Sequence, residues 1–554
     1  MRVCVYQFFA QQFINMFADD LELEKVSHTI SVVTHYGHEA FLKGLLNPID
    51  DTKTIKRRQC ELIALKSQPP LIRKIQTTLV DLSNSNVTSA IDDALTPPST
   101  LFAEAVHQVL WAKDSYGAFL NKSSLLLQIL IFWKTIFLPG FAILAPLLGI
   151  LVPYIFLCVL QENYSVSEYL TQLRAVILKQ ISVPSFLQAR GDGDRIGGAL
   201  EMFFIGATIA MFMSGIWNQI ASALHVRAIW NDVRARGAAL KRAIHAVSGI
   251  LAAIDDAPAL TRRGLREVAA RGAAIESAWR GVADAADLVV YGDAWSTTDK
   301  LLEMKEWFGH LDALCAIATC EDICFPRIAA GTDAVLKIRD VVHPLLSPCV
   351  SNSIVLGAAP QPQHAILTGP NRGGKSSFLK SVGLAVVCAQ TWGFAWARTM
   401  IWSPFARICT ALNSVGVLGV GSTFEAEIDY ARSVLEAQGG RTFVLMDEIF
   451  HSTNAHDGVE ASKLFLSQLY DRADAVSVIA THYDALPQLY AARVVPLMMV
   501  AEDGTNGHLR YTYRVARGVS TKSSVLEICA ERGLCAAPPV TPSPSSSATS
   551  HVSI

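Results

Sequence analysis

The stretch that decides the fold is residues 367–377, which read Leu-Thr-Gly-Pro-Asn-Arg-Gly-Gly-Lys-Ser-Ser. It contains Gly-x-x-x-x-Gly-Lys-Ser, from Gly369 to Ser376, the pattern of a phosphate-binding P-loop. Glycines let the backbone turn tightly and point N–H groups at a polyphosphate, and the following helix adds its positive N-terminal end. In such a loop Lys375 reaches the β- and γ-phosphates, and Ser376 is a ligand of Mg²⁺.

The flanking sequence supplies the context that this motif requires. Residues 365–368 are a short apolar run that suits a buried strand, and residues 378–387 suit a helix packed on a sheet. A Gly-rich turn that binds no ligand is the alternative interpretation of the motif taken alone. Three further segments at suitable distances argue against it.

The first of these segments, residues 442–448, reads Thr-Phe-Val-Leu-Met-Asp-Glu. This pattern predicts a buried strand that ends in a Walker B pair, in which Asp447 holds Mg²⁺ and Glu448 activates the attacking water. The second is a predicted strand, residues 478–482, that ends in His482. A histidine there can sense the γ-phosphate, although a lone histidine is more often a structural hydrogen-bonding group. The third, residues 419–427, predicts a Gly-Ser turn that leads into a helix, where Ser422 can meet phosphate held by another subunit.

Together these segments resemble the ATPase domain of the MutS family of DNA mismatch repair ATPases. Residues 368–377 resemble its Walker A segment TGPNMGGKST, and residues 480–483 reproduce its ATHY. Residues 443–448 and 457–458 resemble the family's LVLMDEIGRGTSTYDG, and residues 422–427 resemble its STFMVEM. Residues 350–356 resemble its VPNDIxL through Asn352, and residues 513–528 resemble its closing segment. They follow the family's order over residues 341–532.

This resemblance implies an α/β P-loop (ABC-type) ATPase domain that binds and hydrolyses ATP with Mg²⁺. Ser376 and Asp447 would hold the metal, and Glu448 and His482 would be catalytic. The nucleotide-binding residues that it implies are Gly369, Pro370, Asn371, Gly373, Gly374, Lys375, Ser376, Ser377, Asn352 and Ser422. Ser422 would act across a homo- or heterodimer of ATPase domains, and DNA is the partner to which the family couples this cycle.

The chain departs from the family pattern at several positions. Arg372 replaces Met, Ser377 replaces Thr, and Gly421 stands where the family usually has Arg. Residues 450–455, Phe-His-Ser-Thr-Asn-Ala, replace Gly-Arg-Gly-Thr-Ser-Thr. These departures leave the phosphate-binding groups in place and alter loops that the family uses between subunits.

A weaker resemblance lies upstream. Residues 42–63 resemble the start of the family's helical core, carried by Pro48, Ile55, Arg58 and Gln59. We find no counterpart of the mismatch-reading domain before it. We therefore expect a helical core-like region over residues 1–122, lever-like amphipathic helices over 227–340, the ATPase domain over 341–532 and a disordered Pro/Ser/Thr-rich tail over 533–554.

The remaining region, residues 123–226, is predicted to enter a membrane. Hydrophobic residues make up 51% of the chain and charged residues 17%, which is too apolar for an ordinary soluble ATPase. Leu125–Leu160 contains 26 consecutive uncharged residues and could be one long helix or a two-pass hairpin, because prolines interrupt it. Met202–Leu224, with 23 uncharged residues, is a second candidate span. The alternative is a pair of unusually apolar core helices in a soluble protein.

Charge gives little support for a general nucleic-acid surface. The net charge is −2, so DNA contact would need a local patch such as the arginines of residues 227–280. We favour instead a solvated helix face or the basic flank of a membrane span. That flank places the ATPase domain in the cytosol, the alternative being a soluble nuclear or cytoplasmic protein.

Two smaller expectations concern local structure. Residues 84–100 are polar and contain proline, which predicts a loop. Cys315, Cys320 and Cys324 have a spacing that favours buried thiols over a zinc site completed by His310.

Three functions remain open at this point. The first is an ATPase coupled to DNA, and the second is a membrane-anchored mechanical or scaffolding ATPase without a DNA partner. The third, a degenerate nucleotide switch, is disfavoured by the intact Lys375, Asp447 and Glu448.

Overall fold

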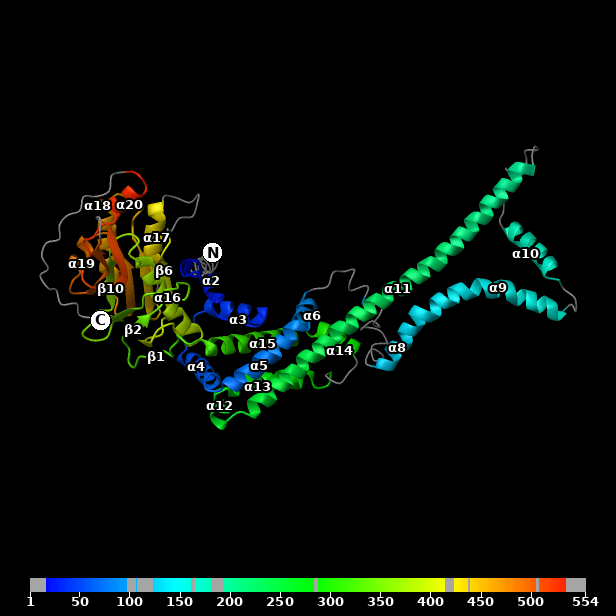
Figure 1. Cartoon of the computed structure of the whole chain (residues 1–554), viewed down its shortest axis with the longest axis horizontal. Helices are drawn as coiled ribbons and strands as arrows, with labels where there is room; N and C mark the ends of the chain where they lie inside the picture. The colour runs from blue at the N-terminus through cyan, green and yellow to red at the C-terminus, as the bar shows by residue number, and fades with distance from the viewer. Residues whose placement is uncertain are drawn as a thin grey trace. The chain divides into compact units, whose positions relative to one another are not determined.

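The structure is a computed structural model that describes residues 16–96, 106, 123–160, 165–180, 194–282, 287–413, 423–436, 439–504 and 508–534. The chain divides into two compact units. The first comprises residues 1–80, 250–271 and 305–554, and the second comprises residues 81–249 and 272–304. The first unit carries both sheets, whereas the described elements of the second are helices (Figure 1).

The larger sheet has six strands in the order β10-β9-β4-β8-β7-β6. Their bounds are β4 His364–Thr368, β6 Arg407–Ala411, β7 Thr442–Asp447, β8 Ala475–Ala480, β9 Val494–Asp503 and β10 Leu509–Arg517. All neighbours pair in parallel except β10, which is antiparallel to β9. Strand β4 is buried along its whole length and lies inside the sheet, so the loop that follows it opens at the carboxyl edge.

Alternation along β7 assigns helices to the two faces of this sheet. Leu445 faces α16 (Lys375–Thr391), where a Cβ added to Gly383 would lie 2.8 Å from its Cδ1. Val444 and Met446 face the other way, into a core that includes Phe465 of α18 (Ala455–Tyr470). Helix α17 (Thr423–Glu436) contributes to the same core.

A smaller sheet, in the order β1-β5-β2-β3, lies beside the first. Its strands are β1 Arg327–Ile328, β2 Leu336–Val341, β3 Asn352–Leu356 and β5 Thr399–Trp402. The Asn352 amide joins the two sheets, donating to the Tyr513 carbonyl at 2.9 Å and accepting from the Val515 N–H at 2.7 Å. Helices α19 (Ala485–Leu489) and α20 (Val525–Glu531) complete the ATPase region.

The N-terminal helices belong to the first unit. They are α2 Leu23–Ser27, α3 His35–Leu45, α4 Thr52–Lys66 and the first part of α5 Pro69–Asn84. Helices α3 and α4 pack against α16. The Arg58 guanidinium donates to the Thr391 carbonyl, and the Gln59 amide donates to the Pro326 carbonyl at 2.7 Å. The Arg-Gln pair that carried the upstream resemblance therefore contacts the ATPase region.

Cys315, Cys320 and Cys324 are free thiols, and burial raises the pKa of each. Cys315 lies on α15 (Thr298–Thr319), as does His310, which lies 3.5 Å from Glu61. No cysteine belongs to the one group of potential metal ligands found among the described residues. Cys315 is buried, as expected, whereas Cys320 and Cys324 are only partly buried.

The second unit contains the apolar segments. Its further helices are α6 Val87–Leu95, α8 Ser124–Phe132, α9 Leu138–Leu160, α10 Val166–Gln180, most of α11 Asp194–Asp255, part of α13 Arg266–Trp279 and α14 Asp287–Ser296. A π-helical turn, η2 (Trp133–Phe137), joins α8 to α9. Leu125–Leu160 is thus one continuous helical run (Figure 1) rather than a two-pass hairpin, although Pro146 and Pro153 lie inside it.

Two predictions need comment. The loop predicted over residues 84–100 is wrong at its centre, where α6 forms because Val87, Ala90, Ile91 and Ala94 recur at helical spacing and are buried. The predicted tail lies almost wholly outside the described residues, which end at Leu534.

The basic stretch after the second candidate span holds helices together. Arg234 and Lys241 of α11 lie 3.7 and 3.2 Å from Asp287 of α14, and Arg236 lies 2.9 Å from Asp93 of α6. These pairs agree with a solvated, structural role for this part of the stretch. Helix α11 then ends at Asp255, and α12 (Ala259–Gly264) begins after a short break at residues 256–258.

Candidate functional site: a nucleotide-binding P-loop

The loop between β4 and α16 has a backbone that requires glycine. Gly374 adopts φ 96°, in the left-handed region, and a Cβ there would lie 3.2 Å from the Tyr513 ring. At Gly369 a Cβ would lie 2.8 Å from the Cβ of Met499. Arg372 takes φ 65° in the same loop. Because Gly369 and Gly374 carry no side chain, an anion can approach the backbone of the loop closely at these two positions.

Lys375, the first residue of α16, is buried and bends back over the loop. Its Nζ donates to the Gly369 carbonyl at 3.1 Å. Burial lowers the pKa of Lys375, while the carboxylates of Asp447 and Glu448 oppose that shift. The ammonium is therefore held at the P-loop itself, where the phosphates of a bound nucleotide would meet it.

Asp447, at the end of β7, offers a metal ligand. Its Oδ2 accepts a hydrogen bond from the Ser376 hydroxyl. Its Oδ1 is buried and has no hydrogen-bond partner among the residues that the structure describes. Burial raises the pKa of Asp447, and the bond from Ser376 lowers it. An orphaned carboxylate oxygen beside a serine hydroxyl is a hard oxygen donor set, so these residues fit Mg²⁺.

Glu448 is held in place by a hydrogen bond to His482. Its Oε1 lies 2.7 Å from the Nε2 of His482, and this hydrogen bond is the main reason why the pKa of Glu448 is lowered. The Nε2 of His482 is also 3.4 Å from the Nζ of Lys375. The shorter contact assigns the Nε2 proton to the bond with Glu448, which keeps that carboxylate ionised and able to accept a proton from water.

The structure gathers most of the predicted site residues and separates others. Pro370 and Asn371 line one cavity with Gly369, His482 and residues 520–525. Ser377 lies on the first turn of α16, where its carbonyl accepts from the Ser381 hydroxyl at 2.8 Å. Asn352, predicted to bind nucleotide, has its amide hydrogen-bonded to the backbone of Tyr513 and Val515, between the two sheets. Ser422 lies outside the described residues.

Sequence reasoning missed two contributors. The Ser-Thr-Lys-Ser-Ser run at 520–524 lines the cavity beside the P-loop, and its hydroxyls and lysine after Gly518 were the available signal. Tyr513 is 48% exposed and lies next to Gly374, so its ring offers a stacking surface for a nucleobase.

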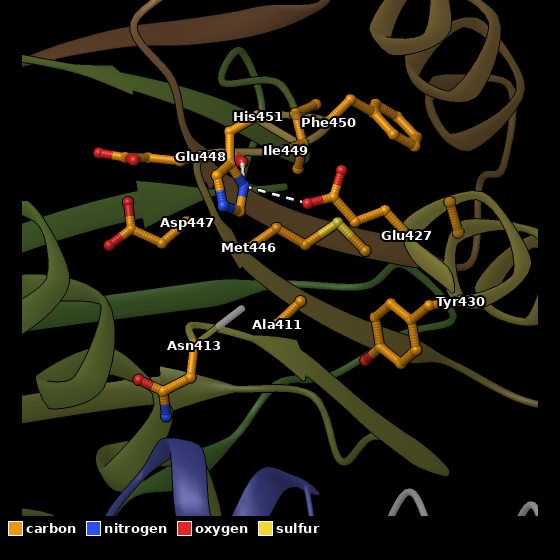
Figure 2. A pocket seen from close by; sticks show the side chains of 11 residues that line it. Ala411, Asn413, Glu427, Tyr430, Met446, Asp447, Glu448, Ile449, Phe450 and His451 are labelled. Carbon is orange, nitrogen blue, oxygen red and sulfur yellow. Dashed lines mark hydrogen bonds and ion pairs between the residues drawn. The ribbon is translucent and has the colours of Figure 1, made fainter. Parts of the chain in front are cut away.

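A second cavity lies where β7 ends, against α17 (Figure 2). Its lining residues are Ala411, Asn413, Glu427, Tyr430, Ala431, Met446, Asp447, Glu448, Ile449, Phe450 and His451. Figure 2 shows the Glu427 carboxylate turned toward the His451 ring, and the two are joined at 3.1 Å. Side chains from both the Walker B segment and α17 therefore meet in this space.

A parallel sheet with a P-loop after a central strand, a Ser-Asp metal pair and a Glu-His pair defines a P-loop ATPase domain. Comparison with known proteins agrees and narrows the class. Residues 365–538 match the family described as MutS domain V. The C-terminal part of the chain is therefore a MutS-type ATPase domain.

The relatives are similar over part of their length only. A "DNA mismatch repair protein MutS" of Chlorobaculum tepidum is 32% identical over 238 residues, which cover 41% of this chain and 26% of the relative. The protein of the same name from Synechococcus sp. strain JA-2-3B'a(2-13) is 29% identical over 252 residues, covering 44% and 28%. That of Natronomonas pharaonis is 32% identical over 204 residues, covering 35% and 23%. The chain thus spans about a quarter of the length of these relatives.

Proposed function

We propose that this protein binds ATP with Mg²⁺ and hydrolyses it as a dimer of ATPase domains, and that the cycle is coupled to duplex or mismatched DNA. The observation that carries the proposal is the convergence of Lys375, Ser376, Asp447, Glu448 and His482 at one edge of the sheet. The relatives are named DNA mismatch repair proteins, and this supports DNA as the partner.

The side chains divide the chemistry among them. The P-loop N–H groups and Lys375 would bind the phosphates, and Ser376 with Asp447 would hold Mg²⁺, which when bound neutralises the charge that develops on the phosphates. Glu448 accepts the proton of the attacking water, and His482 orients the Glu448 carboxylate through the 2.7 Å bond. Ser422 would complete the site of the neighbouring subunit.

The test measures ATP hydrolysis by the purified full-length protein in detergent, with and without matched and mismatched duplex DNA at moderate salt. Lys375→Ala is the blank, because it removes the phosphate-binding ammonium and leaves the rest of the surface unchanged. A rate that DNA stimulates or inhibits supports the proposal. Hydrolysis that is indifferent to every DNA removes the coupling, and absence of hydrolysis above the blank removes the ATPase itself.

A second candidate function is a membrane-anchored mechanical or scaffolding ATPase that has no DNA partner. Within the part of the chain that the structure describes, two helices are long and apolar enough to cross a membrane, Leu125–Leu160 and Ile209–Asp255. None of the apolar window of the first is buried, whereas 56% of the window in the second is buried. In the predicted second span, Met202, Met211 and Trp217 are all exposed. Such a surface is costly in water and suits lipid.

Residues 125–160 would then insert into a bilayer, and the ATPase domain would lie on the cytosolic side. ATPase activity that rises with phospholipid vesicles and ignores DNA would favour this candidate. Salt-sensitive DNA binding by the detergent-solubilised protein would favour the first one.

A further inference from the structure

Phe450 holds an unusual backbone conformation for its size. Its φ is 53°, in the left-handed region, which is unfavourable for a residue with a bulky side chain. The family pattern has glycine at this position, which would adopt the conformation without strain. The Phe450 ring is buried and meets the Phe424 ring of α17 edge-on, with centroids 6.2 Å apart. A strained bulky residue indicates that its contact matters where it is.

His451, the next residue, contacts the same helix. Its Nδ1 lies 3.1 Å from Oε1 of Glu427 on α17 and 2.9 Å from the Glu448 carbonyl oxygen. Glu427 is only 8% exposed, and its Oε2 has no partner among the described residues. One imidazole nitrogen therefore joins a buried carboxylate of α17 to the backbone of Glu448, as Figure 2 shows from the side of the cavity.

The contacts with α17 complete a set of restraints on Glu448. Its side chain is bound by His482 at 2.7 Å, and its N–H donates to the Ala480 carbonyl at 3.0 Å. Its own backbone takes φ 55°, a second left-handed residue in the turn. The carbonyl is restrained by His451. Burying a carboxylate adds little stability compared with an apolar side chain of similar size. The buried Glu427 is therefore better explained by its positioning of His451.

We propose that Phe450 and His451 fix the turn of residues 448–451 against α17. Both would then be positioning residues for Glu448. The inference rests on the proposed function, because it takes Glu448 as the base of ATP hydrolysis. It adds a route by which displacement of α17 changes hydrolysis without changing nucleotide binding. Helix α17 begins at Thr423, directly after Ser422 in the chain, so the route starts next to the residue predicted to meet the partner's nucleotide.

The experiment compares His451→Ala, Glu427→Ala, their double variant, and His451→Arg, which introduces the family's residue. His456→Ala is the matched control, since His456 follows in the same segment and its side chain is 85% exposed. Each full-length protein in detergent is assayed for single-turnover hydrolysis at saturating ATP and for the Kd of a fluorescent ATP analogue. His451 is itself 45% exposed, so its removal leaves the core packed.

Each single alanine variant is expected to hydrolyse about tenfold more slowly, with the Kd within about twofold of wild type. The double variant should be no slower than the singles, because each breaks the same link. His451→Arg should hydrolyse ATP at about the wild-type rate when Glu427 is present. Combined with Glu427→Ala, it should be as slow as the alanine variants.

Independent, multiplying losses in the double variant would overturn the inference, as would unchanged hydrolysis or losses that match the control. Rescue by His451→Arg in the absence of Glu427 would also overturn it. If the wild-type protein shows no hydrolysis above Lys375→Ala, the proposed function fails and the inference falls with it. If the wild-type protein hydrolyses ATP and the substitutions leave its rate unchanged, only the proposed role of the contacts with α17 is overturned.

Discussion

Placing two charges in the middle of α9 should release the protein from membranes. Leu144 and Leu151 are each 50% exposed near the centre of Leu138–Leu160. This helix carries 14 Leu, Ile, Phe and Val residues, which together favour insertion by about 4 to 8 kcal/mol. Replacing two central leucines by arginines makes the free energy of insertion less favourable by about 6 to 8 kcal/mol, which includes the lost contribution of the leucines. The Leu144→Arg/Leu151→Arg protein should therefore no longer insert stably.

The assay is flotation with phosphatidylcholine vesicles on a sucrose gradient after an alkaline wash, which retains inserted protein. Wild type should float, and the arginine pair should stay at the bottom. Leu144→Ala/Leu151→Ala removes the same two side chains without charge and should float. Leu260→Arg, at an 81% exposed position on α12, is the control for added charge and should also float.

ATP binding measured on the same samples shows whether the ATPase domain of the arginine pair is folded; the substitutions lie in the other unit, so they should leave this binding unchanged. Flotation of the arginine pair at the wild-type level, with nucleotide bound normally, would refute α9 as the required anchor and leave the second candidate span, Met202–Leu224, to hold the protein on vesicles. Wild-type protein that remains at the bottom after the alkaline wash would refute insertion altogether. The second result would leave the exposed apolar surface to be covered by protein instead of lipid.

Three further predictions concern the site. Glu448→Gln should keep the Kd for ATP within about twofold and lower hydrolysis by about 10²–10⁴-fold, because only the proton acceptor is lost; a parallel loss of binding, seen by fluorescent-nucleotide titration, would contradict this. Gly374→Ala should weaken ATP binding at least about tenfold in the same titration, since alanine opposes φ 96° by about 1–2 kcal/mol and its Cβ crowds Tyr513; an unchanged Kd would contradict the requirement for glycine. His482→Ala removes the main cause of the lowered pKa of Glu448, so the acid limb of the rate profile should move to higher pH; a limb that stays in place would show that another group controls it.

The ATPase segments could be predicted because each is a local pattern. The P-loop needs glycines at two turns, and residues 442–448 combine a buried strand with two acids at its end. Hydrophobic periodicity and loop residues determine local structure over a few residues. These segments can therefore be predicted without knowledge of the rest of the fold. The same holds for Leu125–Leu160, whose length and lack of charge are visible without any tertiary contact.

Other features depended on contacts between distant segments. The polar composition of residues 84–100 suggested a loop, yet α6 forms because Val87 and Ile91 are buried by packing against other segments. The motif around Asn352 gave no sign of β10, whose approach engages the Asn352 amide with Tyr513 and Val515. Burial of this kind is decided by the partner segment, which local sequence does not describe.

The sequence by itself determined which chemistry is available: a phosphate loop at Gly369–Ser376, two acids at the end of a buried strand, and a helix of lipid-like composition. Only the tertiary structure decided how these groups act together. Parallel pairing of β4, β7 and β8 brings Lys375, Glu448 and His482 within hydrogen-bond distance of one another in succession. The physical reason is that residue type and spacing set local conformation, whereas the order of strands in the sheet sets which of their carboxyl ends meet.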